Sequence, residues 1–123
     1  MDELSEIHQI FVEFENAADP EIKVKKFKVA IDRANECLGR SDLTETDLKK
    51  LNNFKRSYTR TLLNSLPSSG GTTFALWLDY FVALVSVNSE REELFQLNPT
   101  LRDRFDEFLN LHKEELRRLA KLK

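Results

Sequence analysis

The residues best suited to chemistry in this sequence are two histidines, one cysteine and an aspartate isolated in an apolar run. His8 and His112 have side chains that can bind a metal or transfer a proton. A di-iron site in a helical bundle needs Glu-x-x-His twice, and neither histidine has a glutamate three residues before it. The sequence also lacks paired histidines four residues apart and paired cysteines. It therefore predicts no metal site and no cofactor.

His112 falls on an apolar stripe with helical spacing. The stripe consists of Leu101, Phe105, Phe108, His112, Leu116 and Leu119. A histidine in this position is typical of a hydrogen-bonded residue at the rim of a core, and a general base or a pH-sensitive contact is the alternative. A further hypothesis is an enzyme site built from Asp79, His112 and Tyr58, but no spacing in the sequence brings these residues together. We therefore expect no catalytic residues and no enzymatic activity.

Cys37 lies on the apolar stripe of a predicted helix and is the only cysteine in the sequence. An internal disulfide is impossible with one cysteine, which favours a reducing compartment and an inert, packed thiol. The N-terminal stretch MDELSEIHQIF is acidic and has neither the basic nor the apolar region of a secretory signal. The expected location is the cytoplasm.

Asp79 is the one charge in the stretch FALWLDYFVALVSV, residues 74–87. Fourteen helical residues rise about 21 Å, too short for a bilayer core of about 30 Å, so no transmembrane segment is expected here. A helix that is apolar nearly all round is typical of the central helix of a bundle. Asp79 is then expected at the rim of the core, or buried against Arg56, Tyr58 or Arg60 on the third helix.

The elements that must position these residues are all predicted to be helices. A chain of 123 residues with only three glycines and three prolines predicts an all-α, single-domain bundle of four to five helices. The first helix is expected over about residues 2–17. The second begins after the N-cap Asp19 with Pro20 and ends at Gly39, and the third begins after the N-cap Thr44 and ends near Pro67.

A flexible link at about residues 67–72 is expected to separate these three helices from the C-terminal part. The central apolar helix follows at about 73–88. Ser89 and Glu92 have the spacing of a capping box before a short helical piece that ends at Leu97. Asn98 and Pro99 then open a long C-terminal helix at about 99–121.

Charge is unevenly distributed along the chain, although its net value is only −2. Residues 1–22 contain seven acidic residues and no Lys or Arg, whereas residues 23–60 contain eleven Lys or Arg and five acidic residues. The simpler interpretation is an acidic first helix lying beside basic second and third helices. The alternative is a nucleic-acid-binding face on the third helix, where no acid occurs from Leu48 to Leu78. Its residues are Lys49, Lys50, Lys55, Arg56 and Arg60.

The function favoured by the sequence is a small protein–protein interaction module, either an adaptor or a regulatory or inhibitory binding protein. Nine Phe, one Trp and two Tyr make the chain rich in aromatic residues for a thin bundle. Rings left outside the core would form a homodimer seam or a groove for a partner helix. We predict Trp77, Tyr80 and Phe81 as the partner-binding anchors, because aromatic residues often dominate interface energies. The expected partner is another protein or a second copy of this chain.

Overall fold

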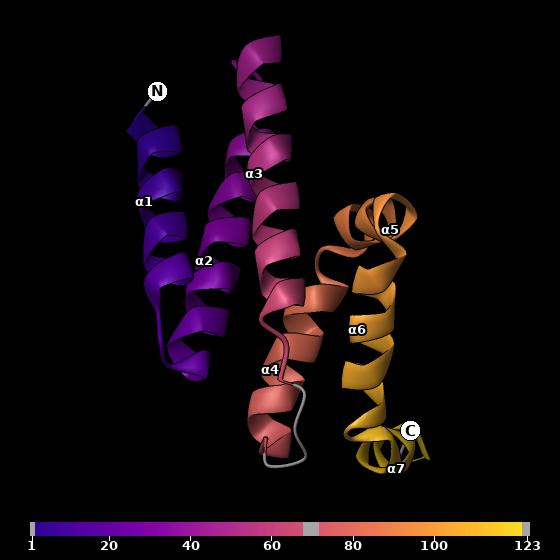
Figure 1. Cartoon of the computed structure of the whole chain (residues 1–123). Coiled ribbons are helices and arrows are strands. Elements are labelled where there is room, and N and C mark those ends of the chain that lie inside the picture. The colour runs from indigo at the N-terminus through magenta and orange to yellow at the C-terminus, as the bar shows by residue number, and fades with distance from the viewer. Residues whose placement is uncertain (1, 68–71, 122–123) are drawn as a thin grey trace.

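The computed structural model describes residues 2–67 and 72–121, and every regular element within them is a helix (Figure 1). The all-α prediction is confirmed, but the predicted count of four to five is wrong, since seven helices lie in the described residues. They are α1 (Asp2–Asn16), α2 (Pro20–Leu38), α3 (Glu45–Asn64), α4 (Phe74–Val85), α5 (Asn88–Leu97), α6 (Pro99–Asn110) and α7 (Lys113–Lys121). Most of the predicted link at 67–72 lies outside the described residues.

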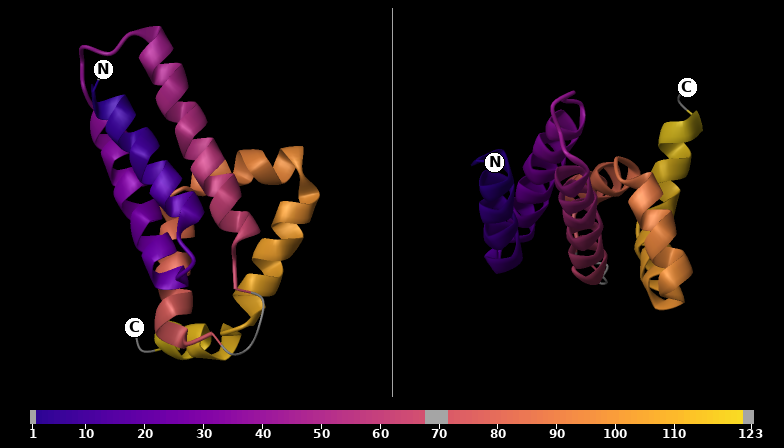
Figure 2. Two further views of the ribbon diagram at one scale, coloured as in Figure 1. Left: turned by 60° about the vertical axis from the view of Figure 1, so that its left-hand side comes forward. Right: turned by 90° about the horizontal axis from the view of Figure 1, so that it is seen from above.

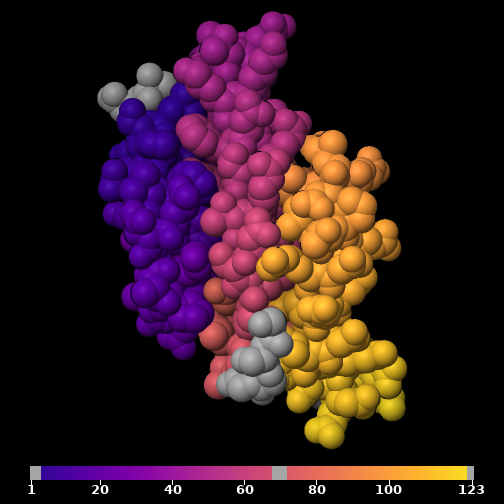
Figure 3. Space-filling model, viewed as in Figure 1, coloured from indigo at the N-terminus to yellow at the C-terminus, as the bar shows by residue number. Residues whose placement is uncertain are grey.

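The helices pack in two groups that share α3 as a neighbour. α1 and α2 form a hairpin, and α3 packs against both. α4 packs on α2, while α5 and α6 pack on the opposite side of α3 from that hairpin, with α5 running crosswise (Figure 2). The N-terminal turns of α3 stand out beyond the other helices in the space-filling view (Figure 3).

At the starts of α2, α3 and α6 the capping residues predicted from the sequence make the expected hydrogen bonds. Asp19 Oδ1 accepts a hydrogen bond from the Glu21 N–H at 2.9 Å, and Thr44 Oγ1 accepts one from the Asp47 N–H at 3.1 Å. Asn98 Oδ1 accepts from the Thr100 N–H at 3.1 Å. Each bond satisfies an amide that has no partner inside its helix. The predicted starts of α2, α3 and α6 are therefore confirmed.

The predicted capping box at Ser89 is wrong. α5 begins one residue before it, at Asn88, and the preceding Val87 makes no side-chain capping bond. Arg91 holds this corner instead, since its guanidinium donates to the Leu84 carbonyl at the end of α4 and to Asn88 Oδ1. A contact with the previous helix thus replaces the local cap.

The predicted long helix at 99–121 is also wrong, because a turn at Leu111 and His112 divides it into α6 and α7. At this turn His112 Nε2 lies 3.1 Å from the Thr72 carbonyl oxygen. The His112 ring also packs against Phe74 and Trp77, with ring centroids 5.5 and 5.4 Å away. These contacts join segments about forty residues apart, and apolar spacing along one helix carries no information about them.

The core is built from side chains of α1 to α6, and α7 contributes no fully buried residue. The largest fully buried side chains are Trp77, Tyr58, Tyr80, Phe14, Phe27 and Phe108. α4, predicted as the central apolar helix of the bundle, is covered on only part of its circumference: Trp77 and Tyr80 are buried, whereas Val82 and Val85 are 50% and 52% exposed. Too few helices surround α4 to cover its whole circumference, and one face is left open to solvent.

Candidate functional site

The three predicted anchors point mainly into the protein. Trp77 is fully buried, and its Nε1–H donates to the Phe108 carbonyl at 2.8 Å. Tyr80 is also buried, with its hydroxyl donating to the Pro20 carbonyl at 3.3 Å. Phe81 stacks on Trp77 with ring centroids 5.3 Å apart and is only partly buried. Of the three anchors, Phe81 alone keeps surface that a partner can reach in this conformation.

The exposed apolar surface of α4 is turned away from Trp77 and Tyr80, and Phe81 lies at one of its edges. We call it the outer strip, and it consists of Ala75, Leu78, Val82 and Val85. Ala75, Val82 and Val85 are exposed and Leu78 is half-buried. Successive members are three, four and three residues apart, which is the spacing of a helix–helix seam. This spacing is visible in the sequence, but the predicted anchors rest on aromatic content, and they are therefore Trp77, Tyr80 and Phe81.

Asp79 borders the outer strip on the side facing α2. Its Oδ1 lies 3.8 Å from Lys28 Nζ, and the two side chains are 49% and 37% exposed. The expected place at the rim is confirmed, but the partner is Lys28 and not Arg56, Tyr58 or Arg60. A groove of about 240 Å³ runs beside this ion pair, lined by Lys28, Asp32, Val82, Ala83 and Ser86. The outer strip thus has an ionic edge.

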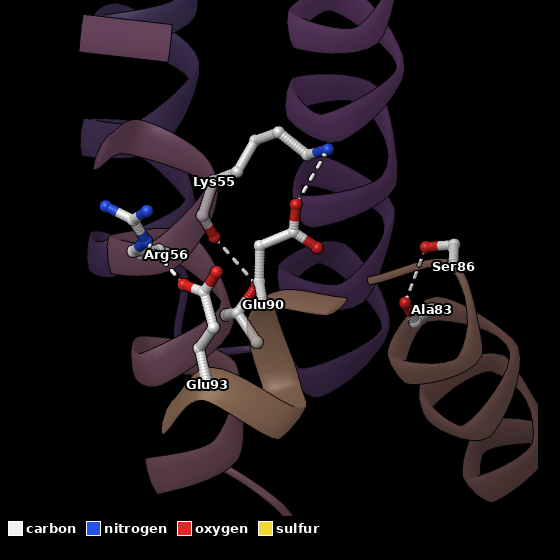
Figure 4. A network of polar contacts seen from close by, with 7 residues as sticks. Lys55, Arg56, Ala83, Ser86, Glu90 and Glu93 are labelled. Atoms are coloured by element: carbon white, nitrogen blue, oxygen red, sulfur yellow. Dashed lines mark hydrogen bonds and ion pairs between the residues drawn. The ribbon is translucent and has the colours of Figure 1, made fainter. Parts of the chain in front are cut away.

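The five basic residues proposed for nucleic acid divide into two sets. Lys55 Nζ lies 2.9 Å from Glu90 Oε1, and Arg56 Nε donates to Glu93 Oε2 at 2.8 Å (Figure 4). Both glutamates come from α5, so their charges compensate two of the five cations. The other members are exposed and form no ion pair within the part of the chain that the structure describes: Lys49, Lys50 and Arg60. Nucleic-acid binding by α3 stays a prediction, now carried by these three residues.

The residues of the enzyme hypothesis occupy separate environments. The Tyr58 hydroxyl donates to the Ile7 carbonyl at 2.6 Å, and burial raises the pKa of this phenol far above its usual value of about 10. His112 contacts Thr72, and its Nδ1 lies 3.6 Å from Glu115 Oε1. Asp79 pairs with Lys28 on α2. These three side chains share no polar partner, so the structure does not join them into one arrangement of nucleophile, base and orienting group.

Neither a cluster of metal-binding side chains nor a membrane-spanning helix occurs in the described ranges 2–67 and 72–121. No group of three or more His, Cys, Asp or Glu residues there is arranged to hold a metal ion. No described helix combines the length and the apolar character needed to cross a bilayer. Cys37 is buried on α2, as its place on the apolar stripe predicted.

Comparisons with protein-family models, with curated proteins and with solved structures found no match.

Proposed function

We propose that this chain is a small helical protein–protein interaction module, an adaptor or a regulatory or inhibitory binding protein that works without catalysis. Its contact surface is the outer strip of α4. The observation that carries the proposal is the half-exposure of Val82 and Val85 on the most apolar helix of the chain. Covering the open half of one such valine contributes about 1 kcal/mol, so a partner that covers the whole strip gains several times this amount.

The form of the partner follows from the spacing of the strip. The side chains of the outer strip are three, four and three residues apart. This spacing allows a second helix to pack on them, with its own apolar side chains inserted between them. Ala75 at one end lets the backbone of that helix approach closely, since its side chain is a single methyl group. The partner is therefore a helix with an apolar seam of the same spacing. Cys37, with no second cysteine in the sequence, supports the reducing cytoplasm as the setting.

A photo-crosslinking amino acid placed at Val82 tests this function in cells that express the full chain. The matched control carries the same group at Leu97 of α5, which is 77% exposed and lies on a different helix. We expect recurrent adducts at position 82 whose crosslinked segment is a helix with three–four apolar spacing, and none of these adducts at position 97. Identical adducts at both positions, or none at position 82, would show that the outer strip is not a contact surface.

A further inference from the structure

We propose that the helix covering the outer strip is α4 of a second copy of this chain, packed antiparallel to the first. This inference rests on the proposed function and adds the identity of the partner. In an antiparallel pair with its two-fold axis at the level of Tyr80, Leu78 of one copy meets Val82 of the other. Ala75 of one copy likewise meets Val85 of the other. In each of these two contacts a larger side chain of one copy packs against a smaller one of the other. The outer strip is therefore complementary to a second copy of itself.

The ionic edge supports a second copy because each copy brings both a carboxylate and an ammonium group, which can also pair across the axis. Asp79 follows Leu78 on the side facing α2, so the two aspartates of a pair approach each other near the axis. Each aspartate is paired with Lys28 of its own copy, so this edge of the dimer holds two carboxylates and two ammonium groups. The 3.8 Å separation and the half-exposed side chains leave Lys28 free to reach the aspartate of the other copy.

The opposite edge of the strip adds an aromatic contact. Phe81 precedes Val82 on the edge of the strip away from Asp79; it is partly buried and stacks on Trp77 with ring centroids 5.3 Å apart. In the antiparallel pair the two Phe81 rings lie near the axis and cover each other. The exposed part of Phe81 is covered in this way.

The size of the strip sets the strength of the pairing. Residues 75–85 rise about 15 Å along the helix, which gives less contact than the about 800 Å² per partner of stable interfaces. We therefore expect a weak, reversible dimer whose population rises with protein concentration.

Sedimentation velocity of the full chain from about 10 µM to about 1 mM tests the pairing over the range of weak dissociation constants. We expect the average mass of the wild type to rise toward twice that of one chain. Val82→Glu should weaken pairing at least tenfold, and the control Leu97→Glu should leave it unchanged. Circular dichroism of both variants checks that the fold is intact. A Val82→Glu chain that pairs as the wild type does would overturn the proposal.

A charge exchange at the ionic edge tests the orientation without altering the apolar strip. Asp79→Lys places four ammonium groups at one edge of the pair and should weaken it at least tenfold. The double variant Lys28→Asp with Asp79→Lys restores two charges of each sign and should restore pairing. If the double variant pairs as weakly as Asp79→Lys alone, the antiparallel arrangement is wrong.

The two proposals fail in different ways. If the wild type stays monomeric at every concentration while position 82 still crosslinks to a helix of another protein, the second copy is wrong and the interaction module stands. If no association and no adduct at position 82 occur, both proposals are wrong. If the adduct at position 82 is α4 of the same chain, both are supported.

Discussion

At the scale of single residues, the buried rings of this protein act as hydrogen-bond donors to distant backbone. Trp77 donates to Phe108 of α6, Tyr58 to Ile7 of α1, and Tyr80 to Pro20 of α2. Burying an indole or phenol without a partner for its polar atom is costly, so each ring is placed where a carbonyl is within reach. The aromatic content that predicted partner anchors is therefore used largely inside the chain.

Replacement of Trp77 by alanine should destabilise the fold by about 3–5 kcal/mol, because it leaves a cavity and removes the donor to the Phe108 carbonyl. Urea unfolding followed by far-ultraviolet circular dichroism measures this loss. Trp77→Phe keeps most of the ring volume and should cost less than half as much. A Trp77→Ala chain that loses less than about 1 kcal/mol would show that the ring is not part of the core.

At the scale of helices, local signals predicted the ends that are made locally. Asp19, Thr44 and Asn98 cap helices with their own side chains, and each was recognisable in the sequence. The turn at Leu111 and His112 cannot be recognised in the sequence, because it contains no glycine or proline and depends on the carbonyl of Thr72. The predicted start of α5 is wrong for a similar reason, since Arg91 binds the end of α4 there. Helix ends made by tertiary contacts cannot be read from neighbouring residues.

Arg91→Met should destabilise the chain by about 1–3 kcal/mol, because the Leu84 carbonyl loses its charged donor and the cation–π contact with Phe105 is replaced by an apolar one. Burial also lowers the pKa of Arg91, which fits a guanidinium held in a poorly solvated corner. Thermal unfolding measures the change, with Arg102→Met on the exposed face of α6 as the control. Equal melting temperatures for the two variants would contradict this role of Arg91.

The two ion pairs between α3 and α5 provide a matched comparison. Lys55 and Glu90 are 13% and 15% exposed, whereas Arg56 and Glu93 are 44% and 54% exposed at a similar distance. Glu90→Gln should cost about 2–3 kcal/mol, because it leaves the ammonium group of Lys55 mostly buried without a counter-charge. Glu93→Gln should cost about 0.5 kcal/mol, since water solvates the arginine that remains. Urea unfolding at low salt measures both, and equal losses would refute the assigned role of burial.

At the scale of the whole molecule, charge runs of one sign in the sequence are compensated by neighbours in space. Glu13 pairs with Lys26 and Glu6 with Arg33, which confirms that the acidic first helix lies beside the basic second. The basic third helix pairs with the glutamates of α5 instead, a neighbour that composition alone could not identify. The same limit applies to the candidate site. The sequence located the apolar helix, but which of its faces stays open depends on where α2, α5 and α6 pack.

The two tyrosines tie the first two helices to the rest of the molecule, and this makes the stability of the whole chain sensitive to alkaline pH. Tyr58 joins α3 to α1, and Tyr80 joins α4 to the start of α2. Burial, followed by the negative charge of Asp19, raises the pKa of Tyr80 to about 12, and burial raises the pKa of Tyr58 further. In the unfolded chain both phenols have a pKa of about 10. Because the folded pKa is the higher one, the stabilisation is complete below about pH 10 and is lost as the pH rises from there through 12.

Each tyrosine should therefore reduce the free energy of unfolding by up to about 1.4 kcal/mol per pH unit within that window. Urea unfolding at several pH values between about 8 and 12 measures the slope, and absorbance at 295 nm follows the phenolates, since the sequence contains no other tyrosine. Lysines also lose charge in this range, so the matched control is the double variant Tyr58→Phe with Tyr80→Phe, which retains every lysine. The difference in slope between wild type and control isolates the two phenols. Parallel slopes would mean that the hydroxyls ionise as readily in the folded chain as in the unfolded one, which the buried contacts to Ile7 and Pro20 should prevent.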